Sequence, residues 1–180
     1  NAVSFLAVLF ALLAMKLAPR KTIPHQGRVL SGLKDGILYA FGSVPIRALL
    51  IMLGLAAVFG MPYAVLMPVF ARDILHGGPR TLGFLAAAAA VGALVGALFL
   101  ASRKTVQGLG KVMVVAISAF GTGVLAFSFS RVLWFSLVMM LLTGFGMMVQ
   151  VASINTILQT IVDDNKRGRV MSLYTMAFIG

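Results

Sequence analysis

Long apolar runs without a single charged residue constrain this chain more than any other feature. They comprise Asn1–Met15, Ala48–Ala71, Thr81–Ala101, Val112–Phe129, Val132–Val162 and a further run that starts at Val170. About 20 apolar residues in a helix, at ~1.5 Å per residue, cross the hydrocarbon core of a bilayer. Because the runs are continuous rather than alternating, they indicate membrane helices and not barrel strands.

The composition supports the same class. The chain is 61% hydrophobic and 11% charged, with a mean hydropathy of +1.04, whereas soluble domains carry roughly 25% charged residues. We therefore predict an all-α integral membrane protein, a polytopic helix bundle of about five spans plus a partial sixth. The absence of cysteine from the sequence excludes disulfides and cysteine-based metal sites.

The basic residues predict how the chain is threaded through the membrane. Twelve of the 15 Lys and Arg residues fall in one alternating set of connections, and the other three fall in the second set. The first set holds Lys16, Arg20, Lys21, Arg28, Lys34, Arg47, Arg103, Lys104, Lys111, Lys166, Arg167 and Arg169, and the second holds Arg72, Arg80 and Arg131. Basic connections stay in the cytoplasm, so we expect the segments 16–47, 102–111 and 163–169 there. The net charge of +11 thus reflects membrane topology rather than a nucleic-acid partner.

We divide the chain into three parts. Residues 1–15 are expected to end a spanning helix, residues 16–47 to form a central cytoplasmic loop, and residues 48–180 to form a C-terminal bundle. The loop contains an amphipathic pattern from Leu30 to Phe41, which indicates a short helix at the membrane surface. Since the sequence starts and stops within apolar runs, we expect a piece of a longer protein.

The apolar runs lack the residue types that usually carry proton coupling, metal binding or catalysis. None of the apolar runs contains Asp, Glu, Lys, Arg or His, although such a residue within a span usually marks proton or ion coupling. His25 and His76 are expected on opposite sides of the membrane and cannot share a metal ion. We therefore expect no metal, no cofactor and no enzymatic activity, and we expect any coupling group to lie outside this chain.

Uncharged polar residues are the candidates for a substrate path. Gln150, the deepest polar residue of the fifth run, Asn155 on the same run, and Tyr63 on the second run could line it. Hydrogen bonds between neighbouring helices are the alternative role for Gln150 and Asn155, because polar side chains avoid lipid.

Helix-distorting and small residues are the candidates for gating. Pro62 and Pro68 each remove a backbone hydrogen bond and should bend the second run. Gly92 and Gly96 are four residues apart and allow another helix to approach closely. These glycines could serve sliding contact between moving helices, and the alternative is ordinary packing within the bundle.

The segment Asp163–Arg169 has the densest charge in the chain. We interpret Asp163, Asp164, Arg167, Gly168 and Arg169 as a cytoplasmic latch, in which Arg167 or Arg169 pairs with a carboxylate in one state and releases it in another. The alternative is a basic anchor with a turn at Gly168 that only sets topology.

Several stretches together resemble a known family. They are Gly32–Tyr39, Leu66–Ala71, Leu82–Phe84 with Gly92 and Gly96, Asn155–Gln159 and, most specifically, Arg167–Tyr174. In this order they resemble helices six to eleven of a twelve-helix major facilitator superfamily transporter, closest to the bacterial transmembrane secretion effectors, which include enterobactin-exporter-like proteins. One departure is the connection after the third run, which keeps its basic residues but lacks the acidic residue of the superfamily motif.

The resemblance implies a secondary active transporter in the bacterial cytoplasmic (inner) membrane. Two six-helix halves would rock around a midplane site, with the N-terminal half of the same transporter as partner. It further implies proton-driven efflux of a small amphipathic compound, drug or siderophore. A non-transporting membrane scaffold or sensor subunit is the alternative, and it would need neither a cavity nor a second half.

Overall fold

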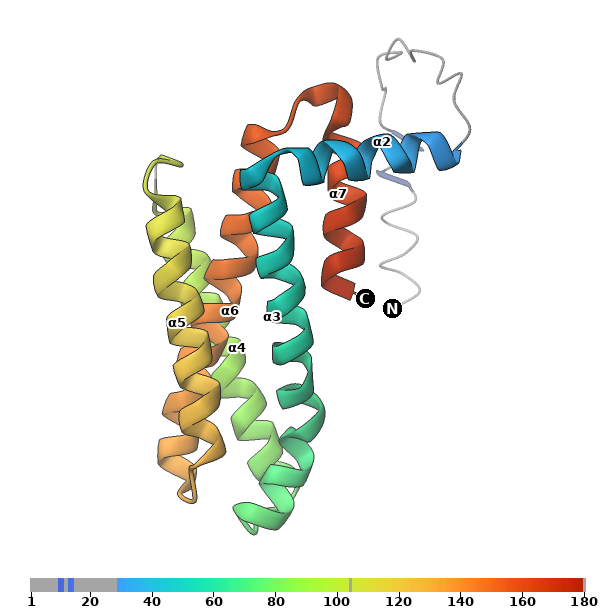
Figure 1. Ribbon diagram of the computed structural model, residues 1–180. Coiled ribbons are helices and arrows are strands. Elements are labelled where there is room, and N and C mark those ends of the chain that lie inside the picture. Colours follow the sequence, from blue (N-terminus) through green and yellow to red (C-terminus); the bar gives the residue numbers. More distant parts are fainter. Residues whose placement is uncertain (1–9, 12, 15–28, 104, 180) are drawn as a thin grey trace.

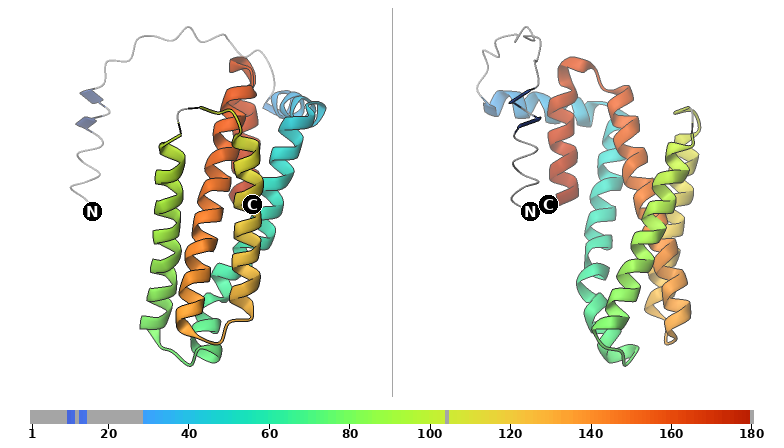
Figure 2. Two further views of the ribbon diagram at one scale, coloured as in Figure 1. Left: turned by 90° about the vertical axis from the view of Figure 1, so that its left-hand side faces the viewer. Right: turned by 180° about the vertical axis from the view of Figure 1, so that it is seen from behind.

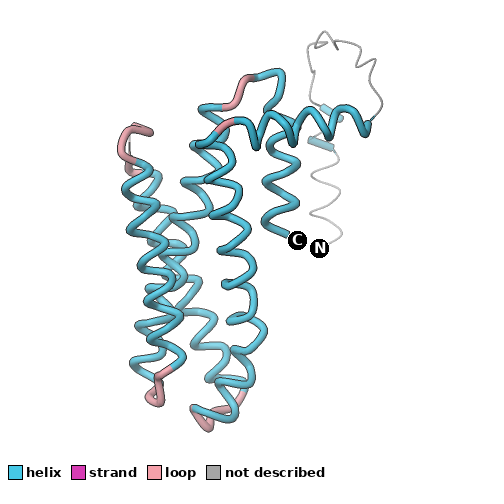
Figure 3. The backbone as a smooth tube through the Cα atoms, in the orientation of Figure 1, coloured by secondary structure: helices cyan, strands magenta, loops and turns pink. Residues whose placement is uncertain are grey.

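The chain forms a bundle of long helices in the computed structural model, which describes residues 10–11, 13–14, 29–103 and 105–179 (Figure 1). The elements are α2 (Val29–Gly42), α3 (Val44–Val69), the π-helical turn η1 (Phe70–Ile74), α4 (Pro79–Ala101), α5 (Leu109–Ser128), α6 (Leu133–Ile161) and α7 (Asp164–Ile179). The described residues contain helices and loops but no strand (Figure 3). The predicted all-α class is therefore confirmed.

Four helices in the described part of the chain are long and apolar enough to cross a membrane. They are Val44–Ile74, Pro79–Ala101, Leu109–Ser128 and Leu133–Ile161, and they run alongside one another in every view (Figures 1 and 2). They correspond to the second to fifth apolar runs, so the predicted multi-pass bundle is confirmed. The first run, residues 1–15, lies almost entirely outside the described residues.

The connections between the spans alternate between the two ends of the bundle. The α3–α4 and α5–α6 connections lie at one end, and the α4–α5 and α6–α7 connections lie at the other, where α2 runs sideways from the start of α3 past α7 (Figures 1 and 3). The larger predicted set of Lys and Arg residues gathers at this second end, as far as the structure describes them. These residues belong to α2, to the connections there and to the adjacent helix ends. We call this second end the basic end.

Glycines allow α4, α6 and α5 to pack with their backbones nearly touching. A Cβ atom added to Gly92 would overlap the carbonyl oxygen of Leu141 on α6, and one added to Gly144 would overlap the backbone of α4. On the α5 side, a Cβ on Gly146 would stand 2.6 Å from the Ala116 carbonyl oxygen. Small residues permit this approach between membrane helices, so these three helices form one tightly packed unit.

Two apolar clusters lie at different heights of the bundle. The cluster toward the basic end joins α2, α3 and α7 to parts of α5 and α6, and its buried members include Ala40, Leu49, Leu53, Ile154, Leu158, Val170 and Tyr174. The other cluster joins the far ends of the spans, and its buried members are Met67, Ala71, Leu85, Phe127 and Met140. Aliphatic and aromatic side chains thus hold α3 to the rest of the bundle at both ends.

The structure corrects the expected turn at Gly168. Helix α7 begins at Asp164 and continues through Gly168. The carbonyl oxygen of Asp163 accepts hydrogen bonds of 2.9 Å from the backbone N–H groups of both Lys166 and Arg167, which starts the helix. The acidic Asp164 in the first turn also favours a helix N-terminus. A single exposed glycine costs a helix only about 1 kcal/mol, so Gly168 does not stop it.

Helix starts also differ from the predicted boundaries by a few residues. Helix α3 begins at Val44 rather than Ala48, with Pro45 in its first turn, and α5 begins at Leu109 rather than Val112. The extension of α3 includes Arg47, and that of α5 includes Lys111. The predicted boundaries stop at these basic residues, because they are drawn from the apolar pattern alone. Membrane helices commonly continue past the hydrocarbon core, because helix formation depends on the backbone and not on hydropathy.

Candidate functional site

A cavity opens between the packed α4–α6–α5 unit and the helices α3 and α7. Its larger chamber has a volume of about 320 Å³ and is lined by Tyr63, Ala89, Ala90, Ala93, Gly144, Met147, Met148, Val151 and Phe178. A smaller chamber is lined by Leu53, Ala56, Ala57, Phe120, Met147, Gln150, Val151 and Phe178. The two chambers share Met147, Val151 and Phe178, so they are adjoining parts of one cavity.

Two of the three predicted substrate-path residues line this cavity. Gln150 on α6 is only 2% exposed and lines the smaller chamber. Tyr63 on α3 lines the larger chamber, and its ring meets the Phe120 ring edge to face at 6.1 Å between centroids. An otherwise apolar cavity therefore has one amide and one phenol among its lining residues.

The third predicted residue, Asn155, lies away from the cavity lining. Its side-chain oxygen accepts a hydrogen bond from the amide of Gln159, one turn further along α6, and it lines neither chamber. The polar pair satisfies itself within one helix, which is common for side chains four residues apart. Asn155 lies closer than Gln150 to the basic end.

The two prolines of α3 lie within a continuous helix. Both Pro62 and Pro68 are inside α3, and the π-helical turn η1 follows Pro68 directly. At this transition the N–H group of Phe70 points to the carbonyl oxygens of both Leu66 and Met67. A missing N–H group loosens the helix and permits such a wide turn. In Figure 1 this lower part of α3 turns toward the start of α4.

The predicted gating glycines lie at the back of the cavity wall. Gly92 contacts the backbone of α6, and a Cβ on Gly96 would stand 3.0 Å from the Phe145 carbonyl oxygen. Ala93, between them in sequence, lines the larger chamber. The glycines therefore determine how close α4 comes to α6, and thereby the position of one cavity wall.

The latch residues at the basic end meet α2. The Arg169 guanidinium lies 3.6 Å from the Asp35 carboxylate, and the two helices are close enough that a Cβ on Gly36 would stand 3.1 Å from the Arg169 Cβ. The Tyr39 hydroxyl donates a 3.2 Å hydrogen bond to the Asp163 carboxylate. The ammonium of Lys166 stands 4.1 Å from the centre of the Tyr39 ring, a cation–π contact.

The two candidate arginines differ in their partners. Arg167 pairs with Asp164 at 2.7 Å, and both residues belong to α7. Arg169 alone pairs with a carboxylate of another helix, Asp35 on α2. Of these two arginines, Arg169 is therefore the one whose ion pair connects α7 to α2 in the described part of the chain.

A family model described as a transmembrane secretion effector matches residues 1–180 of this chain. The chain belongs to the transmembrane secretion effector family. The match agrees with the resemblance to a major facilitator transporter in the motifs from Gly32 to Tyr174. A search of curated proteins and a search of solved structures each found no match.

The described part of this family member presents a largely apolar cavity. Over that part, no three His, Cys, Asp or Glu side chains gather to hold a metal ion. The cavity lining consists of aliphatic, aromatic and methionine side chains with Gln150 and Tyr63. Such a lining suits a ligand that is mostly apolar and carries a few hydrogen-bonding groups.

Some wall residues of the secretion effector were not singled out from the sequence. Phe178 of α7 and Val151 of α6 line both chambers, and so does Met147. The abundance of methionine was the one available indication, because Met suits adaptable cavity walls. Asp35 and Tyr39 were likewise not expected as partners of the latch.

Proposed function

We propose that this secretion effector is the cavity-bearing C-terminal half of a secondary transporter that exports a small amphipathic compound, drug or siderophore. The proposal depends on the larger chamber of about 320 Å³, which Tyr63 lines, together with the adjoining smaller chamber, which Gln150 lines. Small-molecule sites typically measure ~300–1,000 Å³, so this cavity suits part of a binding site. The N-terminal half of the transporter would supply the rest.

The wall chemistry supports a broad substrate class. Met147 and Met148 lie side by side in sequence on the larger chamber, and thioether side chains adapt to ligands of different shape. The Gln150 amide can donate and accept hydrogen bonds, so it would orient an uncharged polar group of the substrate. A permanently charged substrate would find no counter-ion on the described wall.

We assign the driving force to the proton gradient across the bacterial inner membrane. Because the apolar runs of this chain carry no Asp, Glu, Lys, Arg or His, we assign the proton-binding group to the N-terminal half. In this scheme the α4–α6–α5 unit moves as one body, while the contacts between α2 and α7 at the basic end hold one state of the alternating-access cycle.

An efflux assay tests this function in the complete transporter. Amphipathic dyes or catecholate siderophores are added outside energised everted membrane vesicles, and their uptake is followed with and without a protonophore. We expect protonophore-sensitive uptake of at least one compound and a roughly fivefold or greater reduction for Gln150→Ala, since a lost hydrogen bond in a buried site costs about 1–3 kcal/mol.

Gln159→Ala is the matched control, because Gln159 is the same residue type on the same helix but is exposed and lines neither chamber. It should retain transport. Equal effects of the two substitutions would refute the cavity as the substrate site, and a complete lack of transport would favour a scaffold or sensor subunit.

A further inference from the structure

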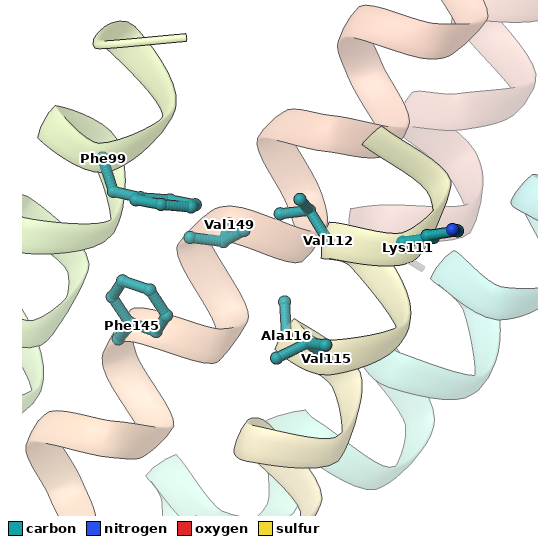
Figure 4. Close-up of a pocket in the computed structure, with 7 residues that line it drawn as sticks. All are labelled: Phe99, Lys111, Val112, Val115, Ala116, Phe145 and Val149. Atoms are coloured by element: carbon teal, nitrogen blue, oxygen red, sulfur yellow. The ribbon is translucent and has the colours of Figure 1, made fainter. Parts of the chain in front are cut away.

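A second hollow lies away from the proposed substrate cavity, between α4 and α5. It has a volume of about 220 Å³ and is lined by apolar side chains of α4, α5 and α6 together with Lys111. Figure 4 shows Phe99 and Val149 pointing toward each other above the ring of Phe145, while the Lys111 ammonium is directed away from the other lining residues. Val115 on its rim is 66% exposed, so this groove is open to the surroundings of the bundle.

Another hollow, of about 140 Å³, lies nearer the basic end. We call it the polar hollow, because Arg103, Thr105 and Thr156 line it together with the apolar Leu100, Val106 and Leu109. It involves the same helices α5 and α6 and the end of α4. On α6, Val149 of the groove and Thr156 of the polar hollow are seven residues apart, which places them on one helix face two turns apart. The two hollows therefore follow each other along the same side of the bundle.

The polar hollow is lined by a guanidinium group, that of Arg103, in which one nitrogen lacks an acceptor among the described residues. The Nε atom of Arg103 is buried and has no hydrogen-bond partner among the described residues, while one Nη atom donates to the Gln107 carbonyl oxygen at 3.3 Å. A guanidinium is planar, has five N–H donors and favours acceptors with several oxygens, such as phosphate. The segment 102–111 carries three basic residues and no acidic one, so no carboxylate of its own connection can satisfy Arg103.

A second buried donor, Ser153, lies on α6 between the residues that line the two hollows. Ser153 is fully buried, and its hydroxyl also has no hydrogen-bond partner among the described residues. Ser153 is three residues before Thr156 and four after Val149, so it shares their face of α6. Unpartnered polar groups thus occur where the groove meets the basic end, and apolar side chains line the remainder.

We propose that the groove and the polar hollow together bind an anionic glycerophospholipid. Its phosphate would contact Arg103 at the basic end, and one acyl chain would lie along the groove past Phe99 and Val115. Headgroups and acyl chains occupy these depths in a bilayer, and basic pockets between spanning helices on the cytoplasmic side favour anionic lipids. A helix of a partner protein would fill the groove but leave the guanidinium without an acceptor.

Native mass spectrometry of the complete transporter in detergent tests this site. The protein is titrated with phosphatidylglycerol, with phosphatidylcholine of the same acyl chains, and with phosphatidylglycerol in the presence of inorganic phosphate. We expect preferential binding of phosphatidylglycerol and a roughly fivefold weaker affinity for Arg103→Gln, the change that one basic residue contributes at a membrane surface. Arg103→Lys should retain part of the preference, because it keeps the charge.

Matched variants separate a specific site from general adsorption. Arg131→Gln removes an equal charge at the opposite end of α5 and should bind as the unmodified protein does. Val115→Trp should block the groove, whereas Val114→Trp, at a residue that is 59% exposed but outside the lining, should not. Equal binding of the two lipids, equal effects of the two arginine or the two tryptophan variants, or displacement of the lipid by inorganic phosphate would overturn the proposal.

Discussion

At the level of single residues, the space beside each glycine decides its role. On α4, Gly83 has nothing within 4 Å of the position of an added Cβ, whereas Gly92 faces the backbone of Leu141. Both are glycines within one apolar helix, and only their neighbours differ. Gly92 therefore permits the close approach of α4 and α6, while Gly83 merely lowers helix propensity.

Alanine substitutions test this difference. We expect Gly92→Ala to destabilise the bundle by roughly 1–3 kcal/mol, because overpacking forces the two backbones apart. Gly83→Ala should be neutral or stabilising by up to about 1 kcal/mol, since alanine favours the helix. Unfolding in mixed detergent–SDS micelles, followed by circular dichroism, measures both. Equal stabilities of the two variants would contradict the α4–α6 packing.

At the level of elements, α2 and α7 are held together by contacts at the basic end. The ion pair between Arg169 and Asp35 connects the two helices directly. The hydrogen bond from Tyr39 to Asp163 connects α2 to the residue just before α7. Asp35 is 62% exposed, so solvent screens the ion pair and it contributes at most about 1 kcal/mol to stability. Contacts this weak can form and break during a conformational cycle.

Removing the ion pair should affect transport more than stability. We expect Arg169→Ala to lower transport by roughly fivefold, which corresponds to a shift of about 1 kcal/mol between two states, with little change in unfolding. The exchanged pair Asp35→Arg with Arg169→Asp should restore part of the activity. Vesicle efflux measures both variants.

Arg167→Ala is the control for this experiment, because it removes an equal charge from a pair internal to α7. Its transport should stay close to that of the unmodified protein. If Arg167→Ala and Arg169→Ala reduced transport equally, the segment would act as a basic anchor rather than a latch.

At the level of the whole molecule, the spans run up and down and place most basic residues at one end. His76 lies in the α3–α4 connection and Gln107 in the α4–α5 connection, so they are at opposite ends, and both are exposed. If the basic end faces the cytoplasm, the two positions must differ in their access to external reagents.

Single cysteines test this orientation without background labelling, because the sequence contains no cysteine. A membrane-impermeant maleimide applied to intact spheroplasts should label His76→Cys directly. It should label Gln107→Cys only after the membrane is permeabilised. The reverse pattern would show that the basic end faces outward.

The sequence by itself determined the class, the approximate spans and their alternation. Continuous apolar runs and the unequal sharing of Lys and Arg are local properties that each segment carries wherever it packs. For the same reason the amphipathic pattern from Leu30 to Phe41 predicted a helix, and α2 covers that stretch.

Only the tertiary structure decided which faces meet. Gln150 and Asn155 are similar polar residues on one helix, yet only Gln150 lines the cavity. Arg167 and Arg169 are two residues apart, yet only Arg169 reaches α2. Cavity walls and ion pairs arise where residues distant in sequence converge, as Phe178 does with Tyr63. A one-dimensional pattern contains periodicity but not the neighbours of each helix face, because those depend on how all the helices pack together.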